Sequence, residues 1–230
     1  PDDPTKLQSD LDSLVDWAKN AQMKFNVDKC EYMCISRKPN ETLNRNYSMS
    51  NKSLTSVDEI NYLGVTIDNK LSFNNHINNI CKKASKTLFM LMRCLKKAKS
   101  KTRRTAYYTI CRPVLEFATH TWSPYKQKHI RQLEGINRKA FRWVYNLKKY
   151  DHISDLMIAR DWPTLSDRRI NNDIKMYNRI MCGKAALDIE KYSLHTSESH
   201  NTRYGATKGC INTDTAKYSF KHRIHKLLQS

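Results

Sequence analysis

Residues 76–98 read H-I-N-N-I-C-K-K-A-S-K-T-L-F-M-L-M-R-C-L-K-K-A and predict one long amphipathic helix. At 100° per residue its apolar side chains occupy about 120° of the helical arc. They are Ile77, Ile80, Cys81, Ala84, Leu88, Leu91, Met92, Leu95 and Ala98. The cations occupy about 140° on the opposite side. They are Lys82, Lys83, Lys86, Arg93, Lys96 and Lys97. One face of this helix should therefore pack against the protein, while the other carries almost only positive charge.

Positive charge is concentrated around this helix. The chain has 230 residues, 41 Lys and Arg against 22 Asp and Glu, and a net charge of +19. The segment 82–149 holds 19 of these bases and only two acids, Glu116 and Glu134. A surface that serves solubility alone mixes both signs. A block of one sign is typical of a protein that binds the phosphate backbone of nucleic acid, and a basic surface without a partner is the alternative.

The composition argues against several other classes of protein. No apolar run approaches the roughly 20 residues that a membrane-spanning helix needs, so we expect no membrane partner. The five glycines form no Gly-rich phosphate loop. Seven dispersed cysteines without a C-x-x-C pair predict reduced, intracellular thiols. Cys182, His195, His200 and Cys210 lack the close cysteine pair of a zinc knuckle, so we expect no metal site in this chain.

The first 68 residues predict a small unit of one helix and several short strands. The helix should cover 3–20, with Asp3 as its cap. Its apolar stripe is Leu7, Leu11, Leu14, Val15 and Ala18. The strands are expected at 23–27, 31–36, 47–49, 54–57 and 61–68. Gly64 inside the last strand indicates a bulge or a close approach of the backbone to something else.

The remaining residues predict further helices. They are expected at 100–119, 125–147, 152–159, 165–182 and 217–228. Pro113 should kink or split the first of these, because proline removes an intrahelical hydrogen bond. Its apolar stripe is Ala106, Ile110, Val114, Phe117 and Ala118, and that of 165–182 is Ile170, Ile174, Tyr177 and Met181. The fold class is therefore α+β, predominantly α, with a basic helical domain at 69–150 and a helical extension at 151–230 whose polar stretch 188–216 should be poorly ordered.

Six stretches of sequence together resemble one protein family. They are L-Q-S-D-L-D-S-L-V-D-W at 7–17 with M-K-F-N-V-D-K-C at 23–30, N-Y-L-G-V-T-I-D at 61–68 with H-I-N-N-I at 76–80, R-P-V-L-E-F-A at 112–118 with Trp122 and Pro124, Q-L-E-G-I-N-R-K-A-F-R at 132–142, W-P-T-L-S-D-R-R at 162–169, and Y-S-F-K-H-R at 218–223. Each alone has little specificity. In this order and with these gaps they resemble the reverse transcriptases of non-LTR (LINE-type) retrotransposons, in the part that follows the catalytic aspartates. The resemblance covers essentially the whole chain.

The resemblance implies a palm remnant over 1–68, a thumb bundle over 69–150 and a C-terminal extension after it. Lys29 matches the lysine of motif D, which lies near the departing pyrophosphate and can act as an auxiliary general acid. Tyr62, Leu63 and Gly64 match the primer grip. The plainer alternatives are a surface lysine in a tight turn and an ordinary buried strand.

The resemblance also implies a track of cations along the thumb, which would follow the backbone of an RNA/DNA or DNA duplex. Such contacts are independent of base sequence. The track consists of Lys82, Lys83, Lys86, Arg93 and Lys97, extended by Arg103, Arg104 and Arg112. The four tryptophans, Trp17, Trp122, Trp143 and Trp162, could stack on bases, but we expect core packing for most of them.

The catalytic aspartates of such an enzyme are expected upstream of residue 1, in an F/Y-A-D-D turn. Asp2 and Asp3 precede Pro4 and indicate a helix cap instead. Two-metal phosphoryl transfer needs clustered carboxylates, so Mg²⁺ is expected only in the intact polymerase. The partners would then be the duplex and the missing palm and fingers of the same polyprotein. The family implies an intracellular location, with the nucleus as one option.

The leading interpretation is a fragment of an RNA-directed DNA polymerase that holds the primer–template duplex. The parent protein would be an enzyme, whereas this chain alone should polymerise nothing. The alternative is a self-standing basic helical protein that binds nucleic acid without polymerase activity, and a third option is a genomic remnant that no longer folds. An open frame with F/Y-A-D-D before residue 1 would favour the first, a natural start codon the second, and stop codons the third.

Overall fold

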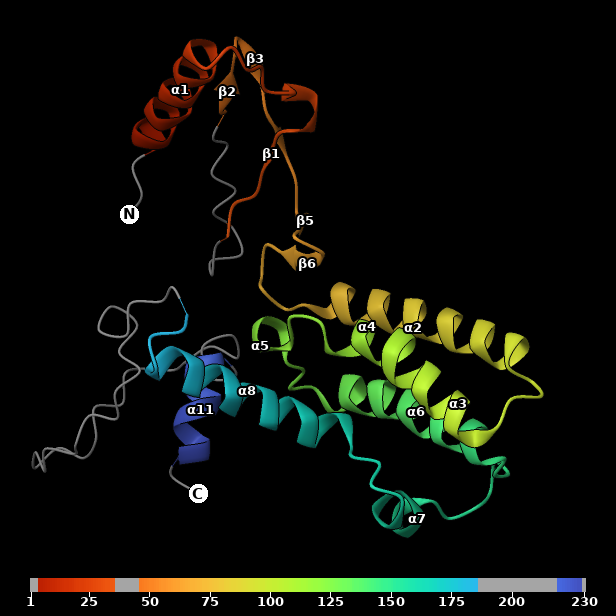
Figure 1. The fold of residues 1–230 in the computed structure, drawn as a ribbon. Helices are drawn as coiled ribbons and strands as arrows, with labels where there is room; N and C mark the ends of the chain where they lie inside the picture. Colours follow the sequence, from red (N-terminus) through yellow and green to blue (C-terminus); the bar gives the residue numbers. More distant parts are fainter. Residues whose placement is uncertain (1–3, 36–45, 186–218, 229–230) are drawn as a thin grey trace, which may run out of the picture. The chain divides into compact units, whose positions relative to one another are not determined.

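The computed structural model describes residues 4–35, 46–185 and 219–228. Its contacts group the chain into two compact units, Pro1–Phe73 and Asn74–Ser230. Helices dominate and the strands are short, so the fold is α+β, predominantly α, as the sequence predicts (Figure 1). The expected cap Asp3 and the polar stretch 188–216 lie outside the described residues.

In its described residues, 4–35 and 46–73, the first unit combines one long helix with six short strands. They are α1 Pro4–Asn20, a 3-10 helix Val27–Lys29, β1 Glu31–Tyr32, β2 Ser48–Met49, β3 Lys52–Ser53, β4 Thr55–Ser56, β5 Glu59–Tyr62 and β6 Val65–Asp68. Strand β1 pairs in parallel with β4, while β2–β3 and β5–β6 are antiparallel hairpins. The helix at 3–20 is confirmed, but the strand expected at 23–27 is wrong. Of the predicted stripe of α1 only Ala18 is buried, and Leu7 and Leu14 are exposed.

The expected single strand at 61–68 is also wrong, because the chain reverses direction inside it. Leu63 and Gly64 form the two-residue turn between β5 and β6, with φ of 48° and 85°. Ser50 and Asn51 do the same between β2 and β3, with φ of 50° and 62°. Two successive positive φ values match the right-handed twist of paired strands. The glycine therefore serves a hairpin turn and not a bulge.

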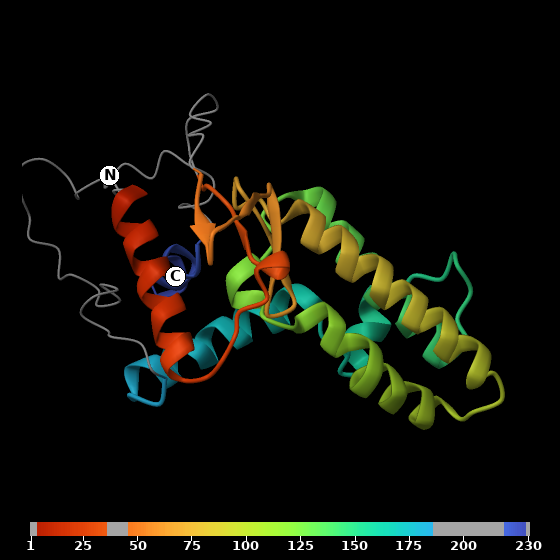
Figure 2. The same cartoon turned by 90° about the horizontal axis from the view of Figure 1, so that it is seen from above.

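The second unit contains all the other described helices. They are α2 Asn74–Cys94, α3 Ser100–Ala106, a π-helix Tyr107–Cys111, α4 Arg112–Glu116, α5 Thr119–Trp122, α6 Gln127–Tyr145, α7 Ser154–Ala159, α8 Leu165–Met181 and α11 Phe220–Leu228. Figures 1 and 2 show the α3–α4 segment running alongside α2. The sequence predicts a kink or a split at Pro113; instead residues 100–116 stay helical throughout, with the π-helix just before the proline. The proline lies in the first turn of α4, where its missing N–H costs no hydrogen bond.

Two of the apolar stripes that the sequence predicts to be buried are partly exposed instead. In the α3–α4 segment Ile110 and Phe117 are exposed. The buried residues there are Arg103, Tyr107, Cys111 and Leu115, four residues apart. The wide turn of the π-helix keeps residues at this spacing on one face. In α8 the buried side chains are Leu165, Arg169, Asp173 and Ile180, so a buried polar residue again replaces an expected apolar one.

Helices α2 and α6 pack side by side and run parallel. At their first turns Asn74 Oδ1 lies 3.3 Å from Lys126 Nζ and 3.0 Å from His129 Nε2. Near their last turns the Arg103 guanidinium donates hydrogen bonds to both helix ends. Its acceptors, at 2.6 to 3.2 Å, are the carbonyl oxygens of Leu95, Lys96 and Trp143 and Oδ1 of Asn146. A cation at two helix C-termini also complements their dipoles, so the pair is fixed at both ends.

Candidate nucleic-acid interface

The predicted cationic face of α2 is exposed along its whole length. Lys82, Lys83, Lys86 and Arg93 project from the helix into solvent, and Lys97 is exposed in the turn that follows. The opposite face is buried through His76, Ile77, Cys81, Ala84, Leu88 and Leu91. The helix is therefore held by its apolar side, which leaves the cations available to a ligand. Their contact with a duplex stays a prediction.

The predicted extension of the cation track does not include Arg103, because this residue is buried. Its side chain is only 7% exposed, and its donors are used on the ends of α2 and α6. Arg104 is half-buried and donates to the carbonyl oxygen of Asp161 at 2.9 Å. Arg112 is also half-buried, with its guanidinium 4.0 Å from the Tyr108 ring centroid. Arg103 is thus a structural residue, since a buried guanidinium with four acceptors cannot reach a phosphate.

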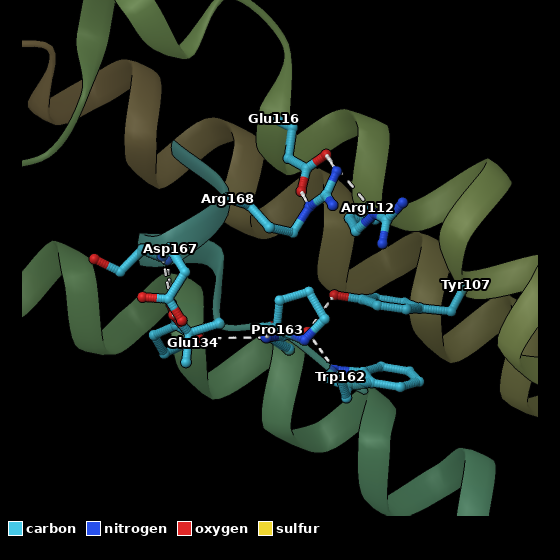
Figure 3. Close-up of polar contacts among 11 residues, drawn as sticks. Tyr107, Arg112, Glu116, Glu134, Trp162, Pro163, Asp167 and Arg168 are labelled. Carbon is cyan, nitrogen blue, oxygen red and sulfur yellow. Dashed lines mark hydrogen bonds and ion pairs between the residues drawn. The ribbon is translucent and has the colours of Figure 1, made fainter. Parts of the chain in front are cut away.

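The two acids of the basic segment are turned into the protein (Figure 3). Glu116 accepts hydrogen bonds from Arg168 through both carboxylate oxygens, the longer one being 2.9 Å. Glu134 Oε1 accepts from the backbone N–H of Ser166 at 2.9 Å, in the first turn of α8. Its other oxygen accepts from Asn137 Nδ2 at 3.3 Å. Neither acid therefore neutralises the exposed cations.

The site prediction missed a second row of cations, on α6. Lys128, Arg131, Arg138 and Lys139 are all exposed. Within the described residues none of these four forms an ion pair with an acid. Lys139 Nζ lies 3.9 Å from the centroid of the Phe89 ring on α2, which joins the two rows. The signal was present in the sequence, because residues three, four and seven apart share one helical face.

The other predicted site residues belong to the first unit. Tyr62 and Leu63 are 63% and 78% exposed at the tip of the β5–β6 hairpin, beside the equally open Gly64. The alternative of a plain buried strand is therefore wrong. Lys29 is exposed at the end of its 3-10 helix.

The tryptophans divide between core and surface. Trp122 and Trp162 are buried, which confirms core packing for these two. Trp143 is half-buried, with the Arg103 guanidinium 5.8 Å from its ring centroid. Trp17 is 57% exposed on α1 and is thus open to another molecule or to another part of a longer chain.

Among the described residues, possible metal ligands do not cluster, and two of the thiols are buried. No group of three or more His, Cys, Asp or Glu there could hold a metal ion. Of the four residues in the rejected zinc pattern, His195, His200 and Cys210 lie outside the described residues. Burial raises the pKa of Cys81 to about 11 and that of Cys111 to about 12, so both thiols stay protonated and unreactive. No helix among the described residues is long and apolar enough to cross a membrane.

A buried carboxylate ties the last helix to the bundle. Asp173 on α8 accepts from Arg223 Nε of α11 at 2.8 Å, and its other oxygen lies 2.8 Å from His120 Nδ1 of α5. Arg223 also donates to the carbonyl oxygen of His120 at 3.0 Å. Burial alone would raise the pKa of Asp173, but the hydrogen bonds and the charge of Arg223 outweigh it and hold the pKa below its ordinary value.

The interactions of Asp173 with Arg223 and His120 make the stability of the fold depend on pH. Because the folded pKa of Asp173 is depressed, its contribution is present above about pH 4, the unfolded value, and is lost as pH falls through the folded pKa. We expect Asp173→Asn to lower the free energy of unfolding by about 2 kcal/mol at pH 7, because two charge-assisted hydrogen bonds weaken. In thermal melts between pH 7 and pH 3, the difference in Tm between the variant and the parent chain should shrink below about pH 4. A difference in Tm that stays constant with pH would contradict this role of the Asp173 carboxylate.

Comparison with known proteins points to one kind of enzyme. The chain is 24% identical over 178 residues to the RNA-directed DNA polymerase from mobile element jockey of Drosophila melanogaster, which covers 76% of this chain and 19% of that protein. It is 24% identical over 170 residues to the jockey polymerase of Drosophila funebris, with 70% and 18% covered. The probable RNA-directed DNA polymerase from transposon BS of Drosophila melanogaster is 20% identical over 147 residues, with 63% and 16% covered.

The match has clear limits in extent. The chain spans less than a fifth of the length of these curated relatives. No protein-family profile and no solved structure matches it. The three relatives nevertheless agree with the resemblance drawn from the six stretches of sequence. At 20 to 24% identity, the homologues of this chain are thus RNA-directed DNA polymerases of the jockey and BS elements, which are non-LTR elements.

Proposed function

We propose that this chain is the section of a non-LTR reverse transcriptase that follows the catalytic aspartates, and that it holds the primer–template duplex by its phosphate backbone. The observation that carries the proposal is the exposed row of cations on and after α2. They are Lys82, Lys83, Lys86, Arg93 and Lys97. With Glu116 and Glu134 turned inward, this row presents unneutralised charge to a polyanion.

The dimensions of the row suit a duplex backbone. Lys82 and Arg93 are about 16 Å apart along the helix axis, at 1.5 Å per residue. Successive phosphates of one strand rise by about 3.4 Å, so this length matches about five of them. Phosphate contacts carry no base information. A polymerase that must slide along any sequence needs such contacts.

The first unit fits the same role in a longer protein. The exposed tip Tyr62–Leu63–Gly64 supports a contact with the primer, because a strand can approach the backbone closely at Gly64. Lys29 would donate a proton to, or neutralise, the leaving pyrophosphate in the intact enzyme. The described residues offer no cluster of ligands that fits Mg²⁺. The palm and fingers of the same polyprotein would supply those ligands.

Salt-dependent binding tests the proposal. The affinity of the 230-residue chain for a fluorescently labelled RNA/DNA hybrid would be measured by anisotropy from about 50 to about 300 mM salt. We expect log K to fall linearly with log salt, and the five contacts of the α2 row alone to contribute about −4 to −5 to the slope. A hybrid of scrambled sequence should bind equally well. Binding that is absent, or that does not depend on salt, would overturn the proposal.

A further inference from the structure

We propose that Gly135 and the cations around it form a second contact site on α6, where a strand of the same duplex comes close to the helix surface. The inference rests on the proposed function and deepens it, because it names a site that the α2 row does not include. The flanking cations are Lys128, Arg131, Arg138 and Lys139.

Gly135 is placed at the centre of this row. It lies in the middle of α6, Gln127–Tyr145, and is exposed. Arg131 and Lys139 are four residues away on either side, and Arg138 is three residues away, so all share one helical face. The glycine therefore leaves a gap between cations, at the point where a side chain would otherwise stand out from the helix.

Nothing in the described protein explains a glycine at this position. A Cβ atom built on Gly135 would meet no other atom within 4 Å. The residue has no positive φ, unlike Gly64 and Gly183. Glycine is among the least favourable residues inside a helix, because it loses the most conformational freedom on folding. Neither packing nor backbone conformation requires it, which leaves close approach by another molecule as the remaining physical reason.

The α6 row and the α2 row meet on the surface. Lys139 Nζ lies 3.9 Å from the ring centroid of Phe89, which is itself exposed on α2 between Lys86 and Arg93. The two helices are parallel and fixed at both ends, by Asn74 at the first turns and Arg103 at the last. One duplex can therefore contact both rows without any rearrangement of the bundle.

Charge selects the occupant of the site. Four exposed cations around a gap, with no acid paired to any of them in the described residues, complement a polyanion. A sugar–phosphate strand places its charges at the regular spacing that such a row can follow. We therefore assign the gap to a nucleic-acid strand and treat an acidic polypeptide as the competing outcome.

Two neutral substitutions test the gap without changing the charge. Gly135→Ala and Gly135→Gln should each raise Tm by about 2 to 4 °C, because both improve helix propensity and the new side chain points into open space. Affinity for the RNA/DNA hybrid should nevertheless fall, by roughly tenfold for Gln and less for Ala, because the new side chain keeps the strand away from the helix surface while all four cations remain. The salt slope should change little. Asn171→Gln, an exposed neutral change on α8, is the matched control and should bind like the parent chain.

The outcomes separate this inference from the function on which it rests. Equal affinity of the parent and both Gly135 variants would overturn the inference, while a steep salt slope of the parent would still support the function. No salt-dependent binding by the parent would overturn both. Polyglutamate of matched charge is the second probe. If the Gly135 variants weaken its binding as much as that of the hybrid, the gap accepts any polyanion and its assignment to a nucleic-acid strand is wrong.

Discussion

Replacing the five cations of the α2 row by Gln should lower the affinity for an RNA/DNA hybrid by about four orders of magnitude near 0.1 M salt. The changes are Lys82→Gln, Lys83→Gln, Lys86→Gln, Arg93→Gln and Lys97→Gln. The estimate takes one phosphate contact per cation, each of which contributes about 0.9 to the salt slope. The slope should therefore flatten by four to five units. Anisotropy titrations of parent and variant at several salt concentrations measure both quantities.

A control of equal charge makes the result specific. Five other exposed cations, again four lysines and one arginine, are not part of the α2 row: Lys6 and Lys24 of the first unit and Lys175, Arg179 and Lys184 in or just after α8. Their change to Gln lowers the net charge by the same five units. Exposed cations contribute little to stability, so both variants should melt close to the parent. If the control lost as much affinity as the α2 variant, binding would depend on net charge alone and the row on α2 would have no special role.

The sequence predicts α2 well because the pattern that determines this helix lies in residues that are close together in the sequence. The residues between Ile77 and Leu91 alternate apolar and cationic side chains at the helical period, and burial of the apolar side is enough to orient the helix. The same reasoning fails where a polar residue occupies the core. Arg103 and Asp173 are buried because their partners, 40 and 50 residues away along the chain, satisfy them. Hydrophobic periodicity contains no information about such partners.

In the candidate site, too, the sequence predicts only the residues whose exposure depends on their own helix. Exposure of Lys82 or Arg93 could be predicted from the helical face alone, whereas Arg103 carries the same charge and is buried. The sequence predicts one continuous strand through Leu63, because the turn lacks the Asn-Gly or Asp-Gly pair that usually marks a two-residue hairpin. The openness around Gly135 could not be predicted at all, since it depends on what the neighbouring helices leave uncovered.

Asn137 should be the residue whose loss destabilises the second unit most. It is buried on α6, and both ends of its amide are satisfied. Oδ1 accepts from Tyr107 Oη at 2.9 Å and from Trp162 Nε1 at 2.8 Å. Nδ2 donates to the carbonyl oxygen of Pro163 at 3.2 Å and to Glu134. One side chain thus links α6, the π-helix and the segment that leads into α8.

We expect Asn137→Leu to lower the free energy of unfolding by about 4 kcal/mol, because two buried donors lose their acceptor at about 1 to 3 kcal/mol each. Urea unfolding followed by circular dichroism measures the change. The exposed change Asn171→Leu should cost less than about 0.5 kcal/mol, apart from its helix propensity.

A double mutant identifies the cause of that loss. In Asn137→Leu the Tyr107 hydroxyl is left buried without its partner, so removing it with Tyr107→Phe should recover part of the stability. If the two losses simply add, the cost of Asn137→Leu comes from packing and not from unsatisfied donors. The network also separates fold from binding. Asn137 is buried, so the folded fraction of Asn137→Leu should keep the salt slope of the parent, whereas the α2 variant keeps its stability and its slope flattens by about four to five units.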